Sequence, residues 1–464
     1  MSLRTPPVGI RAETMHRYER RAPIIPEHMK GLIARDGLQF KVQRSPIRLF
    51  TADQYRAAGA EIVTELGSDC PVLFGVKQVP HDFFKPGHTY VMFGHVTKGQ
   101  TENMVMLDAM MRNRCNYIDY EYIVNSSGER QVAFGRFAGI AGMTDTLNLL
   151  GERLKLEGIR NPFEAVRQTI WYPTIQSIKT QLAEIGRGIA TNGLPEGMPP
   201  MVVGFTGHGR CSGGAEEIFD QLGAVELTPS QLLDPAVYGN LSRNQVYKVT
   251  FDRVGENGRY ERTDGKTASK LDLDNDPQAF QSSLPKYLDR MTMLVHTALW
   301  QSNQPTLVSQ ELLLGLQGNS GSRLKVFGDI SCDPWNKTTQ KGPMACTLMG
   351  TKPEAPYYVY NPQTGTLTMG IEGIGFPVNA VETMPCEVAY DASLAFSSML
   401  TPYVPGIARA DWGNTYNIGI CSLPEPVRPA VVLWEGRLTP RYESNQVLLA
   451  SLKLNRLSYE DVNA

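Results

Sequence analysis

The sequence predicts an α/β fold of two Rossmann-like domains with parallel sheets and an active-site cleft between them. In the first third of the chain, short apolar runs bounded by Gly, Pro, Asp or Asn alternate with helical patterns, as expected for a buried parallel sheet. At Met201 the pattern starts again with a strand, a glycine turn, a helix and a second strand. Because 464 residues are enough for two hydrophobic cores, these two series predict two domains.

The first, substrate-binding and catalytic domain is predicted over residues 1–142 and is completed by the C-terminal segment 387–464. The helix at 26–36 begins with Pro and Glu, has apolar residues at helical spacing and stops at Gly37. The other helices are expected at 52–59 and 102–112, and the strands at 8–12, 38–42, 71–76, 89–93, 116–120 and 131–134.

The second, nucleotide-binding domain is predicted over residues 143–386. Two long helical patterns, at 138–157 and 162–190, lead into it, and its first strand is Met201–Phe205. The polar stretch 252–285 is interpreted as a loop-rich insertion. Further buried strands are expected at 293–300 and 324–331.

The charge balance and the cysteine pattern exclude several classes of protein. With 45 basic against 47 acidic residues, the chain lacks the net positive charge that binds nucleic acid or anionic lipid. No apolar run reaches the ~18–20 residues of a membrane span, and the N-terminus resembles neither a signal peptide nor a transit peptide. A cytoplasmic location is therefore expected. Seven scattered cysteines without a C-x-x-C pair indicate neither a disulfide framework nor a metal site.

The glycine turn of the second domain is typical of dinucleotide binding. Gly207 permits the tight turn, Gly209 lets a pyrophosphate approach the backbone, and the small Ser212 lets the helix pack close to the strand. Arg210, within the same segment, is included among the cofactor-binding candidates. The alternative is a glycine turn that only connects packed elements.

Two residues bear on the choice of cofactor. Glu226 lies nineteen residues beyond Gly207, where a carboxylate accepts hydrogen bonds from a ribose diol and favours NAD(H). Arg243 offers instead a partner for the 2′-phosphate of NADP(H). Glu226 is equally compatible with a surface acid at a strand end. The sequence therefore leaves NADP(H) and NAD(H) both open.

Charged groups follow several strands of the first domain. Lys77 and His95 each follow a predicted strand, and if these strands are parallel neighbours, both residues lie at the carboxyl edge of the sheet, where open α/β sheets bind ligands. An enzyme that forms or reduces an imine needs such an acid–base pair. Arg20 and Arg130 offer planar groups for carboxylates, and Glu121 could bind a substrate ammonium or hold Lys77. Solvated side chains and surface ion pairs are the structural alternatives.

Longer segments of the chain resemble a known family. They look like the lysine–2-oxoglutarate reductase half of α-aminoadipic semialdehyde synthase and, more distantly, like the lysine-forming saccharopine dehydrogenases of the alanine dehydrogenase and transhydrogenase superfamily. The matching segments span nearly the whole chain: VGIRAE…ERRAPIIPEHMKGL, FGVKQVP, FGHVTKGQ, IDYEYIVNSSGERQVAFGRFAGIAGM, FTGHGRCSGGAEEIF, VYGNLSR, GDISCD and VETMP.

The resemblance implies a reaction and a set of site residues. L-lysine and 2-oxoglutarate condense through the lysine ε-amine to an imine, which NAD(P)H reduces reversibly to saccharopine. In this family the residues matching Lys77 and His95 form the acid–base pair. The positions that line the substrate pocket match Arg20, Lys98, Glu121 and Arg130, and the nucleotide turn matches Gly207, Gly209 and Ser212.

The chain departs from the family at three points. Relatives carry I-D-x-L-P near the nicotinamide, where this chain has Glu382, a cofactor-site candidate whose acid is one methylene longer. His208 stands in the nucleotide turn in place of a small or apolar residue. The saccharopine-oxidising half is missing, so a monofunctional reductase is expected.

Two other functions are compatible with the same residues. One is a related alanine- or opine-type amino acid dehydrogenase, because imine reduction needs the same acid and base whatever the substrate side chain. The other is a nucleotide-binding regulatory module that kept the fold. The oligomeric state is open, with a homo-oligomer among the expectations.

Overall fold

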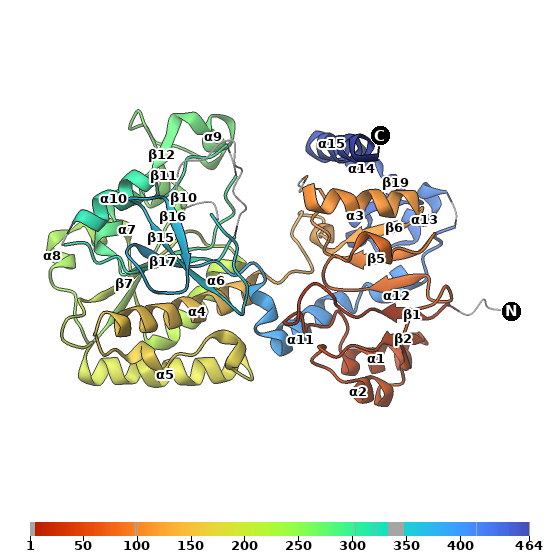
Figure 1. Cartoon of the computed structure of the whole chain (residues 1–464), viewed down its shortest axis with the longest axis horizontal. Helices are drawn as coiled ribbons and strands as arrows, with labels where there is room; N and C mark the ends of the chain where they lie inside the picture. The colour runs from red at the N-terminus through yellow and green to blue at the C-terminus, as the bar shows by residue number, and fades with distance from the viewer. Residues whose placement is uncertain are drawn as a thin grey trace. The chain divides into compact units, whose positions relative to one another are not determined.

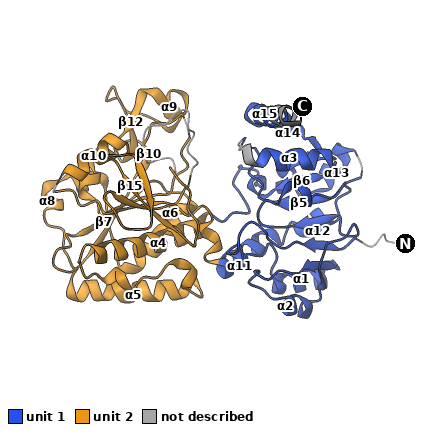
Figure 2. Ribbon diagram, viewed as in Figure 1, with its two compact units in different colours: residues 1–134, 389–464 blue, residues 135–388 orange. Residues whose placement is uncertain are grey.

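The computed structural model describes residues 5–97, 99, 101–301, 303–319, 321–332, 348–413 and 415–463. The chain divides into two compact units (Figures 1 and 2). Unit 1 consists of Met1–Phe134 and Ala389–Ala464, and unit 2 of Gly135–Val388, whereas the sequence analysis drew the boundaries at residues 142 and 387. Each unit contains a large, mainly parallel sheet accompanied by helices, which confirms the predicted α/β class.

The sheet of unit 1 has the strand order β19-β18-β6-β5-β4-β1-β2-β3. Neighbouring strands from β6 to β3 are parallel, and β18 and β19 extend the sheet as an antiparallel edge. The C-terminal segment therefore completes the sheet that the N-terminal segment begins. The strands are β1 (Val8–Ile10), β2 (Phe40–Gln43), β3 (Glu61–Val63), β4 (Val72–Phe74), β5 (Thr89–Met92), β6 (Asn116–Asp119), β18 (Val431–Trp434) and β19 (Arg437–Leu438).

The helices of unit 1 share one hydrophobic core with this sheet. Helix α1 (Pro26–Asp36) has Pro in its first turn, buries Met29 and Leu32, and ends at Gly37 with a left-handed backbone, as the sequence predicts. The others are α2 (Ala52–Ala57), α3 (Thr101–Arg112), α11 (Ala389–Leu400), α12 (Val404–Ala408), α13 (Tyr416–Ser422), α14 (Pro440–Glu443) and α15 (Gln446–Asn463).

The prediction of a strand at 131–134 is wrong. Val132 is fully buried, and the Gln131 amide donates to the Ile123 carbonyl, but this segment is a loop that leads into the first helix of unit 2. A short apolar run can thus be buried without forming a strand, because a strand also needs a neighbouring strand with which to form backbone hydrogen bonds. The strand β3 was not predicted, and it lies at the edge of the sheet, where its residues are only partly buried.

The sheet of unit 2 has the strand order β16-β15-β17-β14-β13-β7-β9-β8. Its strands from β8 to β17 are parallel, and β15 and β16 add an antiparallel edge. The strands are β7 (Met201–Phe205), β8 (Val225–Leu227), β9 (Val246–Thr250), β13 (Met293–His296), β14 (Val326–Asp329), β15 (Tyr357–Asn361), β16 (Thr366–Met369) and β17 (Phe376–Asn379).

Helix α4 packs on β14 and β17 and also against α6; α4 and α5 run along the lower side of unit 2 in Figure 1. The helices of unit 2 are α4 (Gly135–Leu156), α5 (Ile175–Asn192), α6 (Arg210–Phe219), α7 (Pro229–Leu233), α8 (Pro235–Tyr238), α9 (Lys270–Asn275) and α10 (Gln310–Gly318).

Two expectations for unit 2 need correction. The helix expected at 162–190 begins only at Ile175, because Pro173 disfavours a helical conformation at the residue before it, and Thr174 caps the new helix with a capping box. The polar insertion is more ordered than a loop. It forms a small sheet of β10 (Asp252–Val254), β11 (Gly258–Arg262) and β12 (Phe280–Ser282), together with α9.

None of the helices in the described part of the chain combines the length and the hydropathy that a bilayer crossing requires.

Candidate functional site

Lys77 and His95 follow neighbouring strands of unit 1. Strands β4 and β5 are paired in parallel, and the pairing continues beyond them, since the Phe93 amide donates to the Val76 carbonyl at 3.0 Å. Both residues therefore lie at the carboxyl edge of the sheet, as the sequence analysis anticipated for neighbouring strands. The Lys77 side chain is half-buried.

A buried ion pair fixes the backbone at Lys77. The two carboxylate oxygens of Glu13 accept hydrogen bonds from the amides of Val76, at 2.7 Å, and Lys77, at 3.0 Å. Arg11 pairs with Glu13 at 3.1 Å and donates to the Lys77 carbonyl, and the side chains of this pair are 1% and 3% exposed. A Cβ at Gly75 would lie 2.1 Å from Arg11 Nε, so only glycine leaves room for the guanidinium. The pair follows β1, the strand next to β4.

His95 lies beside a buried carboxylate. Its backbone φ of 52° is left-handed, and its ring stacks on Phe93 with an interplanar angle of 12°. Glu121 follows β6, the next strand of the sheet, and its Oε2 lies 3.6 Å from His95 Nδ1. The other oxygen of Glu121 forms an ion pair with Arg130. The structure thus brings together three of the predicted residues, His95, Glu121 and Arg130, at the edge that also carries Lys77.

Asp119 adds a second buried acid behind His95. Its oxygens accept hydrogen bonds from the Tyr117 hydroxyl, at 2.7 Å, and from the Glu121 amide, at 2.9 Å. Burial raises the pKa of Asp119, and the nearby His95 opposes this shift. Asp119 was not among the site residues predicted from the sequence, although its place at the end of a strand, in IDYEYI, was an available signal.

Arg20 and Lys98 are the two remaining candidates for substrate binding. Arg20 is half-buried in the segment between β1 and α1, and none of the contacts between described side chains joins it to the other candidates. Lys98 lies outside the described residues. The neighbouring Arg21 is instead structural: it binds both oxygens of Glu19 and lies 4.3 Å from the Phe134 ring. Burial alone would raise the pKa of Glu19, but Arg21 lowers it.

The glycine turn of unit 2 has the geometry that a nucleotide needs. Gly207 has a φ of 131°, a backbone conformation that residues with a Cβ rarely adopt. A Cβ at Gly209 would meet no atom within 4 Å, so open space lies before the N-terminus of α6. Ser212 is buried and donates to Glu216 at 3.0 Å. The dipole of the ten-residue helix α6 favours an anion at this point.

Close helix packing holds α6 in place. A Cβ at Gly139 of α4 would lie 1.9 Å from the Cys211 carbonyl oxygen, and one at Gly214 would lie 2.1 Å from the Arg136 carbonyl oxygen. These two glycines therefore let the backbones of α4 and α6 touch.

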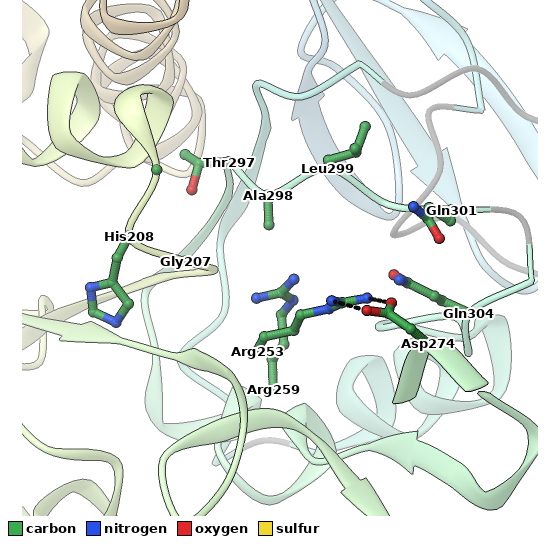
Figure 3. Close-up of a pocket in the computed structure, with 11 residues that line it drawn as sticks. Gly207, His208, Arg253, Arg259, Asp274, Thr297, Ala298, Leu299, Gln301 and Gln304 are labelled. Atoms are coloured by element: carbon green, nitrogen blue, oxygen red, sulfur yellow. Dashed lines mark hydrogen bonds and ion pairs between the residues drawn. The ribbon is translucent and has the colours of Figure 1, made fainter. Parts of the chain in front are cut away.

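A cavity of about 580 Å³ opens beside the glycine turn (Figure 3). This volume lies within the usual range of small-molecule sites. The described residues that line it come from the glycine turn, β10, β11, α9 and the segment after β13: Gly207, His208, Gly209, Arg253, Arg259, Asp274, Thr297, Ala298, Leu299, Gln301 and Gln304. Next to the cavity, His296 Nδ1 lies 2.7 Å from the Thr206 hydroxyl oxygen. Burial, and to a smaller extent the positive charge of Arg259, lower the pKa of His296 to about 3.

Comparison with known proteins identifies the N-terminal part of the chain. Residues 9–141 match the family described as alanine dehydrogenase/PNT, N-terminal domain. The chain is also homologous to alpha-aminoadipic semialdehyde synthase of Arabidopsis thaliana, with 32% identity over 94% of this chain and 41% of that protein. Saccharopine dehydrogenase [NAD(+), L-lysine-forming] of Emericella nidulans is 24% identical over 85% of this chain and 90% of its own.

These matches confirm the resemblance derived from the sequence. The chain spans about half the length, between 41% and 48%, of the alpha-aminoadipic semialdehyde synthases it matches. Among solved structures, an L-alanine dehydrogenase is similar in fold, with a TM-score of 0.59 and 17% identity over 96% of this chain and 100% of that chain. The substrate candidates Lys77, His95, Glu121 and Arg130 all lie within the segment 9–141 that matches the alanine dehydrogenase/PNT N-terminal family.

Two of the cofactor-binding candidates lie away from the cavity. Glu226 is an exposed residue of the edge strand β8, and β9 separates this strand from β7. The role expected for Glu226 required a carboxylate on the strand next to β7. Arg243 precedes β9, and its Nη2 donates to the Leu194 carbonyl at 2.6 Å. Because β9 is parallel to β7, Arg243 lies at the edge of the sheet opposite to the glycine turn.

The other cofactor candidates lie at the carboxyl edge. Arg210 is the exposed first residue of α6. Glu382 is exposed after β17, and its amide donates to the Thr351 carbonyl at 3.1 Å. The charged cavity residues that were not predicted from the sequence are Arg253, Arg259 and Asp274, all within the polar insertion. Its density of charged side chains in GENGRYERTDGK was the only signal, since nothing local shows that β9 pairs with β7.

Proposed function

We propose that this chain catalyses the reductive condensation of L-lysine with 2-oxoglutarate to saccharopine, using NAD(P)H. The observation that carries the proposal is the cluster at the carboxyl edge of unit 1, where Lys77 and His95 follow neighbouring strands and Glu121 lies between His95 and Arg130. Relatives named alpha-aminoadipic semialdehyde synthase and lysine-forming saccharopine dehydrogenase support the same substrate class.

The reaction needs proton transfers at two atoms. The ε-amine nitrogen of lysine attacks C2 of 2-oxoglutarate and loses a proton, and the resulting carbinolamine oxygen must gain a proton to leave as water. Loss of water leaves a protonated imine, whose carbon accepts the hydride of NAD(P)H, so that the nitrogen becomes a secondary amine and NAD(P)⁺ is released. A positioned acid–base pair accelerates such steps by roughly 10²–10⁴. We assign the proton at nitrogen to Lys77 and the proton at oxygen to His95.

Cations are needed because saccharopine contains several carboxylates. Arg130 is half exposed beside Glu121, so its planar guanidinium can exchange the Glu121 carboxylate for a substrate carboxylate. Arg20 and Lys98 are proposed as the other carboxylate ligands, and Glu121 as the ligand of the substrate ammonium.

The glycine turn fits a pyridine nucleotide. When bound, the nicotinamide supplies the hydride for the imine carbon. Gly207 and Gly209 leave the backbone open to a pyrophosphate, and the N-terminus of α6 favours its negative charge. Ser212 keeps α6 close to β7, and Glu382 at the carboxyl edge is proposed to contact the cofactor.

A cytoplasmic location stays a prediction, which cell fractionation tests.

An assay of the purified chain separates the proposal from its alternatives. Oxidation of NADPH or NADH is followed at the nicotinamide absorbance with lysine and 2-oxoglutarate together, with each alone, and with pyruvate plus ammonium. We expect oxidation only when lysine and 2-oxoglutarate are both present. Oxidation with pyruvate and ammonium alone would indicate an alanine-type dehydrogenase. Nucleotide binding without any turnover would indicate a regulatory module.

A further inference from the structure

A second cavity, of about 480 Å³, opens at the amino edge of the unit 1 sheet, and we call it the amino-edge cavity. Its described lining comes from the segments before β5 and β6, the turn after β18 and the segment between α12 and α13. Because β5 and β6 are parallel and β18 is antiparallel to β6, the first three of these meet at one edge of the sheet. Lys77, His95 and Glu121 follow their strands at the opposite, carboxyl edge, so the proposed reaction does not account for this cavity.

Backbone contacts hold the walls of the amino-edge cavity in place. Asn116 is 2% exposed, and its side-chain oxygen accepts from the Glu435 amide at 2.8 Å while its nitrogen donates to the Thr89 hydroxyl at 3.2 Å. A Cβ at Gly436 would lie 2.4 Å from the Met111 carbonyl oxygen, so the turn after β18 lies directly against the segment between α3 and β6. The position of Glu435 is therefore fixed by the fold.

Two residues of the lining have a left-handed backbone, which is uncommon for residues with a Cβ. The φ angle is 50° at Arg114 and 46° at Glu435, and Arg114 Nη2 lies 3.8 Å from Glu435 Oε2 in a long ion pair. Among the described residues four non-glycine positions have such a φ, and a third is His95 of the proposed catalytic cluster. Backbone strain of this kind gathers at ligand sites, so its presence here favours a binding role.

The charged side chains give the amino-edge cavity an excess of positive charge. They are Arg112, Arg114 and Glu435 in the described lining. Asp108 orients Arg112 at 2.5 Å, but the side chains of Arg112 and Arg114 are 64% and 73% exposed, so both present N–H groups to a ligand. The negative end of the α3 dipole offsets only part of this charge. Two guanidinium groups match the oxygens of a phosphate.

An aromatic ring lies in the same lining. Trp412 is half-buried, and its Nε1 donates to the Ile407 carbonyl at 3.2 Å. Trp434 covers part of the Trp412 ring, with centroids 4.9 Å apart and an interplanar angle of 33°. These two contacts hold Trp412 in place, so the rest of its surface offers a pre-oriented platform for a planar group.

We propose that the amino-edge cavity binds a nucleoside monophosphate. Arg112 and Arg114 bind the phosphate, and Glu435 accepts hydrogen bonds from the ribose hydroxyls, as carboxylates do in nucleotide sites. The base stacks on Trp412, because an aromatic side chain accepts the face of any base. A volume of about 480 Å³ suits a ligand of this size and exceeds what a free phosphate needs. The inference goes beyond the proposed function and stands without it.

Isothermal titration of the full chain with AMP tests the inference once the glycine turn of unit 2 is blocked. Gly209→Asp serves this purpose, because the φ of −76° suits any residue and a Cβ there would meet no atom within 4 Å. An aspartate caps a helix well, and its charge repels a pyrophosphate. Loss of NADPH and NADH binding checks the block. We expect this protein to bind one AMP per chain, at least about tenfold more tightly than adenosine or inorganic phosphate.

Single substitutions in the Gly209→Asp protein assign each part of the ligand. Arg112→Gln and Arg114→Gln should each weaken AMP roughly tenfold and leave adenosine within about twofold. Glu435→Gln should remove the preference for AMP over 2′,3′-dideoxy-AMP, which lacks the ribose diol. Trp412→Leu should weaken AMP and adenosine alike, by about tenfold. If it fails to fold, Trp412→Phe replaces it: AMP still binds, and the quenching of tryptophan fluorescence that AMP causes disappears.

Arg35 provides a matched control. Like Arg112, it lies in the last turn of a helix, is 61% exposed and pairs with an acid, Asp36. Arg35→Gln should change AMP binding less than about twofold, because it removes a charge that is not in the lining of the cavity.

Several results would overturn the inference. Absence of AMP binding in the Gly209→Asp protein would remove the site, and phosphate bound as tightly as AMP would make it a simple anion site. Adenosine bound as tightly as AMP, or an equal loss in Arg35→Gln and Arg112→Gln, would remove the arginines from it. None of these titrations involves turnover, so a missing lysine-dependent reaction refutes the proposed function alone, and missing AMP binding refutes this inference alone.

Discussion

Gly214→Ala should destabilise unit 2, because α4 and α6 touch at this residue. The new Cβ would lie 2.1 Å from the Arg136 carbonyl oxygen and 2.9 Å from its carbon, whereas ordinary contacts begin at about 3.4 Å. Both neighbours are backbone atoms, so the two helices must separate by roughly an ångström. Overpacking of this kind costs about 1–3 kcal/mol. We expect urea denaturation, followed by circular dichroism, to show a loss of this size.

The adjacent residue provides a matched control. Gly213 lies in the same helix, is exposed, and a Cβ there would meet no atom within 4 Å. Alanine is a better helix former than glycine by about 1 kcal/mol, so Gly213→Ala should stabilise the protein slightly. Because α6 begins directly after Gly209, Gly214→Ala should also weaken nucleotide binding. Equal stability of the two variants would refute the close packing of α4 on α6.

Three other predictions concern charged groups. Lys77→Met should lower kcat by roughly 10²–10⁴ in steady-state assays while nucleotide affinity, measured by titration, stays the same; an unchanged kcat would remove Lys77 from the mechanism. Glu13→Gln leaves Arg11 buried without a counter-charge and should lower the free energy of unfolding, measured by urea denaturation, by about 3–5 kcal/mol. As a control, Glu65→Gln removes the partner of Lys85 in an exposed ion pair and should leave the free energy of unfolding nearly unchanged. Burial and the neighbouring Asp145 raise the pKa of Glu387, so the folded protein retains a proton that the unfolded chain releases near the ordinary pKa of glutamic acid. The contribution of Glu387 to stability should therefore be fully present below that pKa and be lost as the pH rises through the raised pKa of the folded state. Glu387→Gln should flatten this dependence in urea denaturation measured at a series of pH values, and parallel curves for the two proteins would contradict the raised pKa of Glu387.

The features that the sequence predicts well are local ones. The strand, glycine turn and helix around Gly207 lie within one short segment, so their spacing in the chain reflects their spacing in the fold. Lys77, His95 and Glu121 were found because each follows a recognisable apolar strand, and consecutive strands β4, β5 and β6 are also neighbours in the sheet.

The features that the sequence does not predict depend on contacts between distant segments. The acid Glu226 has the right spacing from Gly207, but β9 pairs with β7 in place of β8, and this choice is made by strand pairing across the sheet. The same pairing brings Arg253 and Arg259 to the cavity from an insertion that looks like a loop. The break at Pro173, by contrast, was visible in the sequence as a residue that disfavours helix before it.

Transfer of the lysine side-chain nitrogen tests the central claim most directly. The purified chain is incubated with lysine labelled with ¹⁵N at the ε-position, 2-oxoglutarate and NADPH, and the products are analysed by mass spectrometry and nitrogen NMR. The proposed reaction predicts one product that contains the carbon skeletons of both substrates and retains the label as a secondary amine. Release of the label as ammonium, or a product that contains only one of the two skeletons, would contradict it.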